Sequence, residues 1–398
     1  MLKPLFITAT GIRSAIGHGG DETWQSLLDE TSGLRPCDFD HVNLSTFIGR
    51  VDDVERQILP QALQDFHCRN NQLALMGLQH EALTARVQQA RKRYGAERIG
   101  VFMGTSTSGI LQTELAYQNR DSVTGALPAD YHYAETHVNF AVTDFVRRTL
   151  GLQGPALTIS TACSSSAKVF ATASRYIDAG LCDAALVGGV DSLCMTTLYG
   201  FSSLELVSDQ PCRPADRNRN GISIGEAAGF ALLETGAEGS PDAFALLGYG
   251  ESSDAHHMST PHPEGKGAAL AMQAALTMAQ LDASEVDYIN LHGTATQSND
   301  RAEDRAVVSV FGDRTPCSST KGWTGHTLGA AGIVEAIISM LCIQHGFIPA
   351  SLNTKQRDAD LQANIVLAQQ RQGVRHVISN SFGFGGNNCA LLFGSVAP

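Results

Sequence analysis

The stretch Ala156-Leu-Thr-Ile-Ser-Thr-Ala-Cys163-Ser-Ser-Ser-Ala-Lys-Val-Phe-Ala-Thr-Ala-Ser-Arg-Tyr-Ile-Asp-Ala179 decides how this chain folds. Residues 156–160 predict a strand, small polar residues follow at a turn, and residues 164–179 predict a helix. Cys163 therefore stands at a helix N-terminus, where the helix dipole lowers the pKa of a thiol and free backbone N–H groups can bind an oxyanion. Cys163 is the candidate nucleophile; the alternative is a buried structural cysteine.

Strands and helices alternate along the whole chain, which predicts an α/β fold with helix-covered sheets. In each half, a turn of small residues opens a long helix: 161–166 in the first half and 325–332 in the second. We therefore expect two similar halves, 1–238 with the cysteine and 239–398 with the histidines described below. The break is expected near 235–242, where Gly, Ser and Pro cluster. The expected strands are 5–10, 99–104, 156–160, 184–189, 229–234, 244–248, 287–292, 364–367, 377–381 and 389–393, and the expected helices are 70–90, 139–150, 164–179, 267–280, 300–310 and 328–344.

Composition excludes several classes of protein. The 398 residues carry a formal net charge of −12, which argues against a nucleic-acid binder. The nine cysteines are scattered without a CxxC pair, so we expect neither a disulfide scaffold nor a zinc site. The most apolar run, 333–343, is interrupted by Glu335, and the N-terminus is interpreted as a first strand rather than a signal peptide. A large cytoplasmic enzyme without a membrane span is expected.

Two histidines occur in glycine-containing turns at the ends of predicted elements. His292 lies in Leu291-His-Gly-Thr-Ala-Thr296 after a strand, and His326 lies in Lys321-Gly-Trp-Thr-Gly-His-Thr-Leu-Gly-Ala-Ala-Gly332 before a helix. A lone histidine is more often structural, but loops on a rigid scaffold are where catalytic groups concentrate. The run Asn380-Ser-Phe-Gly-Phe-Gly-Gly-Asn-Asn388 has no helix after it, so it is no dinucleotide motif. It predicts a tight hairpin or a mobile turn with an aromatic gate.

Taken in order, these motifs resemble the β-ketoacyl carrier-protein synthases of the I/II type and the ketosynthases of type II polyketide pathways. Arg213-Pro-Ala-Asp216 and Ser253-Asp-Ala-His-His-Met-Ser259 fit the same family. The resemblance covers essentially the whole chain. It implies the thiolase fold, a five-layer αβαβα arrangement of two similar halves, usually dimeric. The implied activity is acyl transfer to a cysteine, then decarboxylative condensation with a malonyl carrier-protein thioester that extends the chain by two carbons.

The resemblance also implies a role for individual residues, without a metal or redox cofactor. Cys163 would be the nucleophile, and His292 and His326 would assist decarboxylation and stabilise the enolate. Backbone N–H groups of Cys163 and Phe384 would form the oxyanion hole. The other implied residues are Lys321 and Glu335 in support, Phe384 and Phe382 at the gate, Asp254, His257 and Ser259 in a second gating loop, and Thr294 and Thr296 in substrate binding. Thr107 would lie at the far wall of the acyl pocket, where an unpartnered hydroxyl would favour medium-length or unsaturated chains.

The implied partners are an acyl carrier protein and a second copy, or a related chain-length-factor subunit. Glu205 stands where a basic residue often docks the carrier protein, whereas Arg69 matches another docking position. Asn387 replaces a usual threonine. A specialised pathway, such as that of bacterial aryl polyenes, is favoured over ordinary fatty-acid synthesis. Two alternatives are a thiolase-like coenzyme A enzyme, although Cys389-Ala-Leu391 lacks the Cys-x-Gly turn, and a chain-length factor, which typically lacks the nucleophile.

Overall fold

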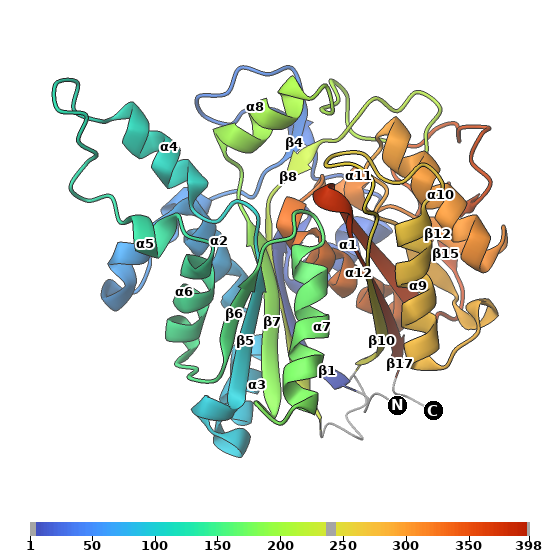
Figure 1. The fold of residues 1–398 in the computed structure, drawn as a ribbon, viewed down its shortest axis with the longest axis horizontal. Coiled ribbons are helices and arrows are strands. Elements are labelled where there is room, and N and C mark those ends of the chain that lie inside the picture. The colour runs from blue at the N-terminus through green and yellow to red at the C-terminus, as the bar shows by residue number, and fades with distance from the viewer. Residues whose placement is uncertain (1–4, 236–243, 396–398) are drawn as a thin grey trace.

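The first half of the chain forms five strands of a mixed sheet (Figure 1). The structure is a computed structural model and describes residues 5–235 and 244–395. Strand order is β1-β9-β7-β5-β6, in which the β7, β5 and β6 strands run parallel and β9 is antiparallel to both neighbours. Their bounds are β1 Leu5–Ser14, β5 Ile99–Gly104, β6 Ala156–Ile159, β7 Ala184–Asp191 and β9 Ala227–Glu234.

The second half repeats this arrangement strand for strand. Its order is β10-β17-β16-β11-β12, again with the last three parallel and β17 antiparallel to both neighbours, and β14 extends the parallel edge. The bounds are β10 Phe244–Ser253, β11 Tyr288–Asn290, β12 Pro316–Ser318, β14 Asn364–Ile365, β16 His376–Gly383 and β17 Asn387–Ser395. The shared topology confirms two similar halves, joined by the antiparallel β1–β10 pair. The expected break near 235–242 lies almost wholly outside the described residues.

Two helices fill the space between the sheets. α7 (Ser165–Asp178) and α12 (Ala331–His345) share one large core cluster with side chains of both halves. They approach so closely that a Cβ on Gly332 would lie 2.4 Å from the backbone nitrogen of Ala167. Helices α2, α3 and α6 cover the outer face of the first sheet, and α9 and α10 cover that of the second (Figure 1). This is the expected five-layer arrangement, and it brings the N-terminal ends of α7 and α12 together.

The remaining elements complete the layers and the surface. The other helices are α1 Gly19–Leu28, α2 Arg69–Leu78, α3 Glu81–Tyr94, α4 Ile110–Gln118, α5 Tyr133–Thr136, α6 Phe140–Leu150, α8 Met195–Ser203, α9 Lys266–Ala279, α10 Gln297–Phe311 and α11 Lys321–Thr324. Short strands are β2 Gly17–His18, β3 Arg35–Pro36, β4 Phe47–Gly49, β8 Ile224–Gly225, β13 Phe347–Ile348 and β15 Gln370–Arg371. The 3-10 turns are η1 Val54–Arg56, η2 Gln61–Phe66, η3 Ala96–Arg98, η4 Ala283–Glu285, η5 Leu328–Ala330 and η6 Phe384–Gly386.

Two expectations need comment. The single helix predicted over 70–90 is wrong: α2 ends at Leu78 and α3 begins at Glu81, because every residue of α2 is buried whereas α3 buries only one face. The segment Leu328–His345 is apolar and long enough to cross a membrane, yet 89% of it is buried inside the fold. Burial on all sides is the property of a core helix in a large protein.

Candidate active site

The nucleophile loop holds Cys163 through a strained backbone. Ala162 adopts a left-handed conformation with φ +52°, which costs a non-glycine residue about 1–2 kcal/mol. Local serine contacts hold it there: Ser165 Oγ donates to the Ala162 carbonyl at 2.6 Å and accepts from the Thr161 N–H at 2.9 Å. The kink places Cys163 beside the first turn of α7, as the sequence predicts, with only 5% of its surface exposed.

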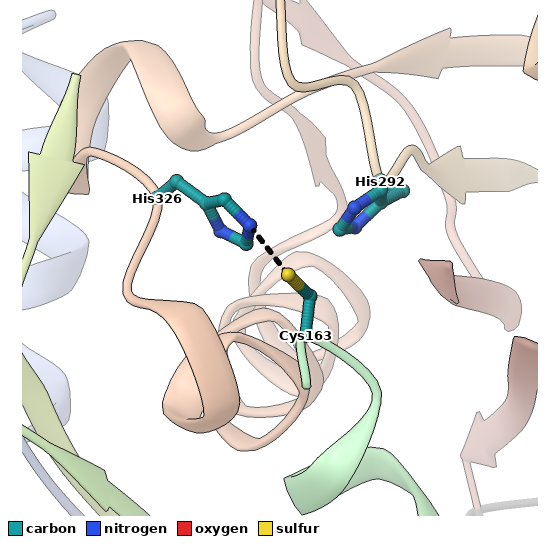
Figure 2. Close-up of side chains that lie close together, drawn as sticks. All are labelled: Cys163, His292 and His326. Carbon is teal, nitrogen blue, oxygen red and sulfur yellow. Dashed lines mark hydrogen bonds between the residues drawn. The ribbon is translucent and has the colours of Figure 1, made fainter. Parts of the chain in front are cut away.

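The expectation of a lowered thiol pKa is wrong. Burial raises the pKa of the Cys163 thiol to about 12, although the Lys321 ammonium and the backbone N–H of Phe384 oppose this rise. Burial of the thiol in this closed site disfavours the thiolate more than these two neighbours favour it. Cys163 therefore needs a proton acceptor, and His326 Nε2 lies 3.0 Å from its sulfur (Figure 2).

His326 is fixed by its backbone rather than by its ring. Its N–H donates to the Ser223 carbonyl at 2.7 Å, and its own carbonyl accepts from the Gly225 N–H at 2.9 Å, in a bridge to β8. Nδ1 is buried and has no hydrogen-bond partner among the described residues. No contact therefore fixes the ring tautomer, so Nε2 can accept the thiol proton or donate a hydrogen bond. Burial lowers the pKa of His326 well below its usual range, which keeps the ring neutral.

His292 is held from both sides by buried charges. Lys321 Nζ lies 3.4 Å from His292 Nδ1, donates to the His292 carbonyl and pairs with Glu335. The backbone N–H groups of His292 and Gly293 donate to Glu303 at 2.8 and 2.7 Å. Because Lys321 donates to Nδ1, the proton of neutral His292 sits on Nε2. Burial and Lys321 lower the pKa of His292, so it acts as a neutral donor.

The three side chains form a donor site rather than a metal site. The ligand-type atoms of Cys163, His292 and His326 lie within 4.8 Å of one another, and the rings of the two histidines are 5.3 Å apart (Figure 2). A cation held by His292 Nε2 would require its proton to move to Nδ1, which faces the Lys321 ammonium. The two histidine side chains are therefore better suited to donate hydrogen bonds to an oxygen that gains negative charge than to bind a metal cation.

A pocket opens onto this cluster and gathers most of the predicted site residues. Its lining includes Cys163, His292, His326, Thr294, Thr296, Asp254, His257, Ser259, Phe382 and Phe384. The pocket volume is about 60 Å³. The Phe384 ring packs at 5.6 Å from that of Phe201. A longer acyl chain requires these aromatic side chains to move.

Three predicted residues lie outside the pocket lining. Lys321 and Glu335 stand behind His292, buried to 1% and 2% exposure. The Thr107 hydroxyl donates a hydrogen bond to Asp191 at 3.0 Å and therefore has a partner within the protein. The predicted preference for medium-length or unsaturated chains, which depended on an unpartnered hydroxyl, is wrong. The matching of Arg69 to a docking position is also wrong for this chain: the side chain is buried and pairs with Glu226.

The most highly bonded carboxylate near the site is one that the sequence analysis missed. Asp191, at the end of β7, accepts hydroxyl hydrogen bonds from Thr105, Ser106 and Thr107 and backbone hydrogen bonds from Ser106, Thr107 and Gly329. It is fully buried and joins the loop after β5 to the start of the α12 helix. No local motif marks it, because its donors lie more than 80 residues away in sequence.

Comparison with known proteins agrees with this geometry. Residues 2–239 match the beta-ketoacyl synthase N-terminal domain, and residues 244–355 match its C-terminal domain. The chain belongs to the β-ketoacyl synthase family. It is 32% identical to the mitochondrial 3-oxoacyl-[acyl-carrier-protein] synthase of Arabidopsis thaliana, over 99% of this chain and 94% of that protein. It is 32% identical to 3-oxoacyl-[acyl-carrier-protein] synthase 2 of Vibrio harveyi, over 99% of both chains.

A solved ketosynthase is similar in both sequence and structure. The ketosynthase ApeO, in complex with its chain length factor ApeC from Xenorhabdus doucetiae, is 40% identical over 99% of this chain and 98% of that chain, with a TM-score of 0.89. This β-ketoacyl synthase is thus a condensing acyltransferase with the thiolase fold. The thiolase-like alternative would require a second cysteine in the site. Cys389 is buried in β17 and is not among the residues that line the pocket, so the site does not support that alternative.

Proposed function

We propose that Cys163 carries the acyl chain and that His292 and His326 serve the two half-reactions. In the first, the Cys163 sulfur attacks the thioester carbonyl of an acyl carrier protein. The thiol proton passes to His326 Nε2 and then to the departing carrier thiol. The 3.0 Å contact between Cys163 and His326 carries this assignment, because a thiol with so high a pKa needs an adjacent base.

In the second half-reaction, a malonyl carrier-protein thioester loses carbon dioxide. The electron pair of the broken C–C bond forms an enolate, whose oxygen accepts hydrogen bonds from Nε2 of His292 and of His326. The enolate carbon then attacks the Cys163 thioester carbonyl, and the Cys163 thiolate leaves. Lys321 fixes the proton of His292 on the nitrogen that faces the pocket. Phe384 would supply the second oxyanion N–H and move aside as the gate.

The nucleophile assignment is tested by incubating the protein with octanoyl-loaded acyl carrier protein and measuring intact and peptide masses. One octanoyl group should appear on the peptide that contains Cys163. The Cys163→Ala protein should gain none, while Cys212→Ala, a control at another buried cysteine, should be acylated normally. Acylation of Cys163→Ala would overturn the assignment.

We also propose that this ketosynthase works with a second ketosynthase-like chain, in a polyene or polyketide-like pathway in the cytoplasm. Its 40% identity to a ketosynthase solved with a chain length factor supports the partner. β6 ends the sheet with one edge unpaired, and nearby apolar side chains are exposed, a combination typical of an interface. These are Tyr117, Val123, Tyr133, Phe140 and Leu157, with α4, α5, α6 and β6 on one side of the molecule (Figure 1). All nine cysteines are free, as a reducing compartment favours.

The partner proposal is tested by co-purification with the chain-length-factor-like chain from the same organism. Leu157→Glu should abolish co-purification, because it places a charge on the β6 edge. Leu270→Glu, at a more exposed leucine on α9, should leave it intact. Equal retention of the partner by both variants would place the interface elsewhere. The division into 1–238 and 239–398 stays a proposal, supported by the repeated strand order on either side of it.

A further inference from the structure

A line of polar contacts leads from the surface of α7 to the turn that carries Phe384. Arg175 pairs with Glu251 at the protein surface. Glu251 Oε1 lies 3.7 Å from Lys168 Nζ, and Lys168 Nζ donates to Asn387 Oδ1 at 3.3 Å. The Lys168 side chain is only 14% exposed, so neighbouring residues cover most of it. The contact between Lys168 and Asn387 is therefore more than a surface pair.

The turn is held differently on its two sides. Gly385 donates its N–H to the Met258 carbonyl at 2.7 Å, and the Gly386 carbonyl accepts from the Asp254 N–H at 2.9 Å. Both partners belong to a partly exposed loop that itself lines the pocket. Asn387 is the residue that ends the turn and begins β17, and its partner lies on a buried helix. Lys168 thus ties the turn to the rigid centre of the molecule.

The helix that supplies Lys168 is also the helix that presents Cys163. The Gly383 backbone packs so closely that a Cβ there would lie 3.2 Å from the Cys163 nitrogen, and the Phe384 N–H lies against the Cys163 sulfur. The separation of that N–H from the sulfur depends on where the turn sits relative to α7. A side-chain contact from α7 to the end of the turn fixes that separation directly.

We propose that Lys168 and Asn387 are positioning residues, which hold the turn Gly383–Asn387 so that the Phe384 N–H faces the acylated sulfur. This inference rests on the proposed role of Phe384 as an oxyanion donor. Asn387 stands where the resemblance leads one to expect threonine, whose hydroxyl oxygen is one bond closer to the backbone. The contact with Lys168 is therefore a property of this chain.

The test is a pair of single variants and their combination. Lys168→Met keeps the aliphatic stem and removes the donor, and Asn387→Ala removes the acceptor. Each should slow acyl transfer from octanoyl carrier protein at saturation by about tenfold, less than the loss of a whole oxyanion donor because the N–H is displaced, not deleted. The midpoint of the pH dependence of Cys163 alkylation by iodoacetamide should rise in both. The double variant should be no slower than either single one.

Two variants provide the controls. Asn387→Asp keeps an acceptor oxygen opposite Lys168 and should retain wild-type rates. Arg175→Met removes the outer partner of Glu251, does not touch the turn, and should also retain them. Wild-type rates and alkylation profiles in Lys168→Met and Asn387→Ala would overturn the inference, as would a fall in thermal stability alone or additive losses in the double variant. That result would not affect the assignment of Cys163 as the nucleophile, which is tested separately by acylation of the Cys163→Ala protein.

Discussion

Replacing Asp191 by asparagine tests whether one buried carboxylate holds the two halves of the active site together. Four of its hydrogen bonds converge on Oδ1 and two on Oδ2. The least disruptive orientation of an asparagine leaves its oxygen in the Oδ1 position and places NH₂ against Ser106 and Gly329. The serine hydroxyl can rotate to accept, but the Gly329 N–H cannot. One buried N–H is then left without a partner.

The expected destabilisation follows from these contacts. An orphaned buried N–H costs about 1–3 kcal/mol, and the four remaining hydrogen bonds each weaken as the charge disappears. Relief from burying a carboxylate offsets part of this loss. The net change in the free energy of unfolding should be about 2–4 kcal/mol, which corresponds to a fall in Tm of about 2–5 °C for a chain of this size.

We expect the loss of the Asp191–Gly329 contact to reduce catalysis as well. Gly329 lies in the turn η5, three residues after His326, so a shift there moves the imidazole that contacts Cys163. Condensation should fall more than tenfold, measured as product released from acyl-enzyme and malonyl carrier protein, because a displaced His326 donates less well to the enolate. The fall should be smaller than the roughly 10²–10³-fold loss that follows removal of a whole donor. Asp287→Asn is the control, because the half-buried Asp287 also accepts backbone N–H groups, from Arg375 and His376, but lies away from the site. An Asp191→Asn protein with wild-type Tm would refute the energetic reasoning, and lost stability with intact condensation would refute the link to His326.

Two other predictions concern the two histidines and the buried Glu303. His292→Ala should reduce condensation by at least a hundredfold while sparing acyl transfer. His326→Ala should impair both steps, because, of the two histidines, it is His326 that contacts the Cys163 sulfur. Burst-phase acylation and single-turnover condensation measure the two steps separately, and equal losses in His292→Ala would contradict this division. Burial raises the pKa of Glu303 from 4.5 to about 7, so the folded protein binds a proton there that the unfolded chain releases between these values. Stability from this group is thus present at low pH and lost as pH rises to 7. The free energy of unfolding of Glu303→Gln should therefore rise by about 3 kcal/mol relative to that of the wild type as the pH increases from 4.5 to 7. Urea titration at several pH values measures this difference. If the difference between the two proteins does not change with pH, Glu303 is ionised throughout.

The local architecture of the site could be predicted from short stretches of the chain. A strand, a small-residue turn and a helix around Cys163 are encoded within about 25 residues, and the structure places them at β6 and α7. The turns that carry His292 and His326 are equally local, since glycine and small residues confine each of them. The order of these motifs was enough to indicate the family and the duplicated fold.

The protonation states and hydrogen-bond partners of these groups depend on how distant segments pack. The pKa of Cys163 depends on how completely other elements exclude water from its sulfur, and this burial raises the pKa that the local sequence predicts to be lowered. Arg69 pairs with Glu226, and Thr107 donates to Asp191; both partners lie more than 80 positions away in the sequence. These contacts contradict the predicted roles of Arg69 in carrier-protein docking and of Thr107 in chain selection. Burial and long-range hydrogen bonding arise when distant segments pack, so no local pattern can report them.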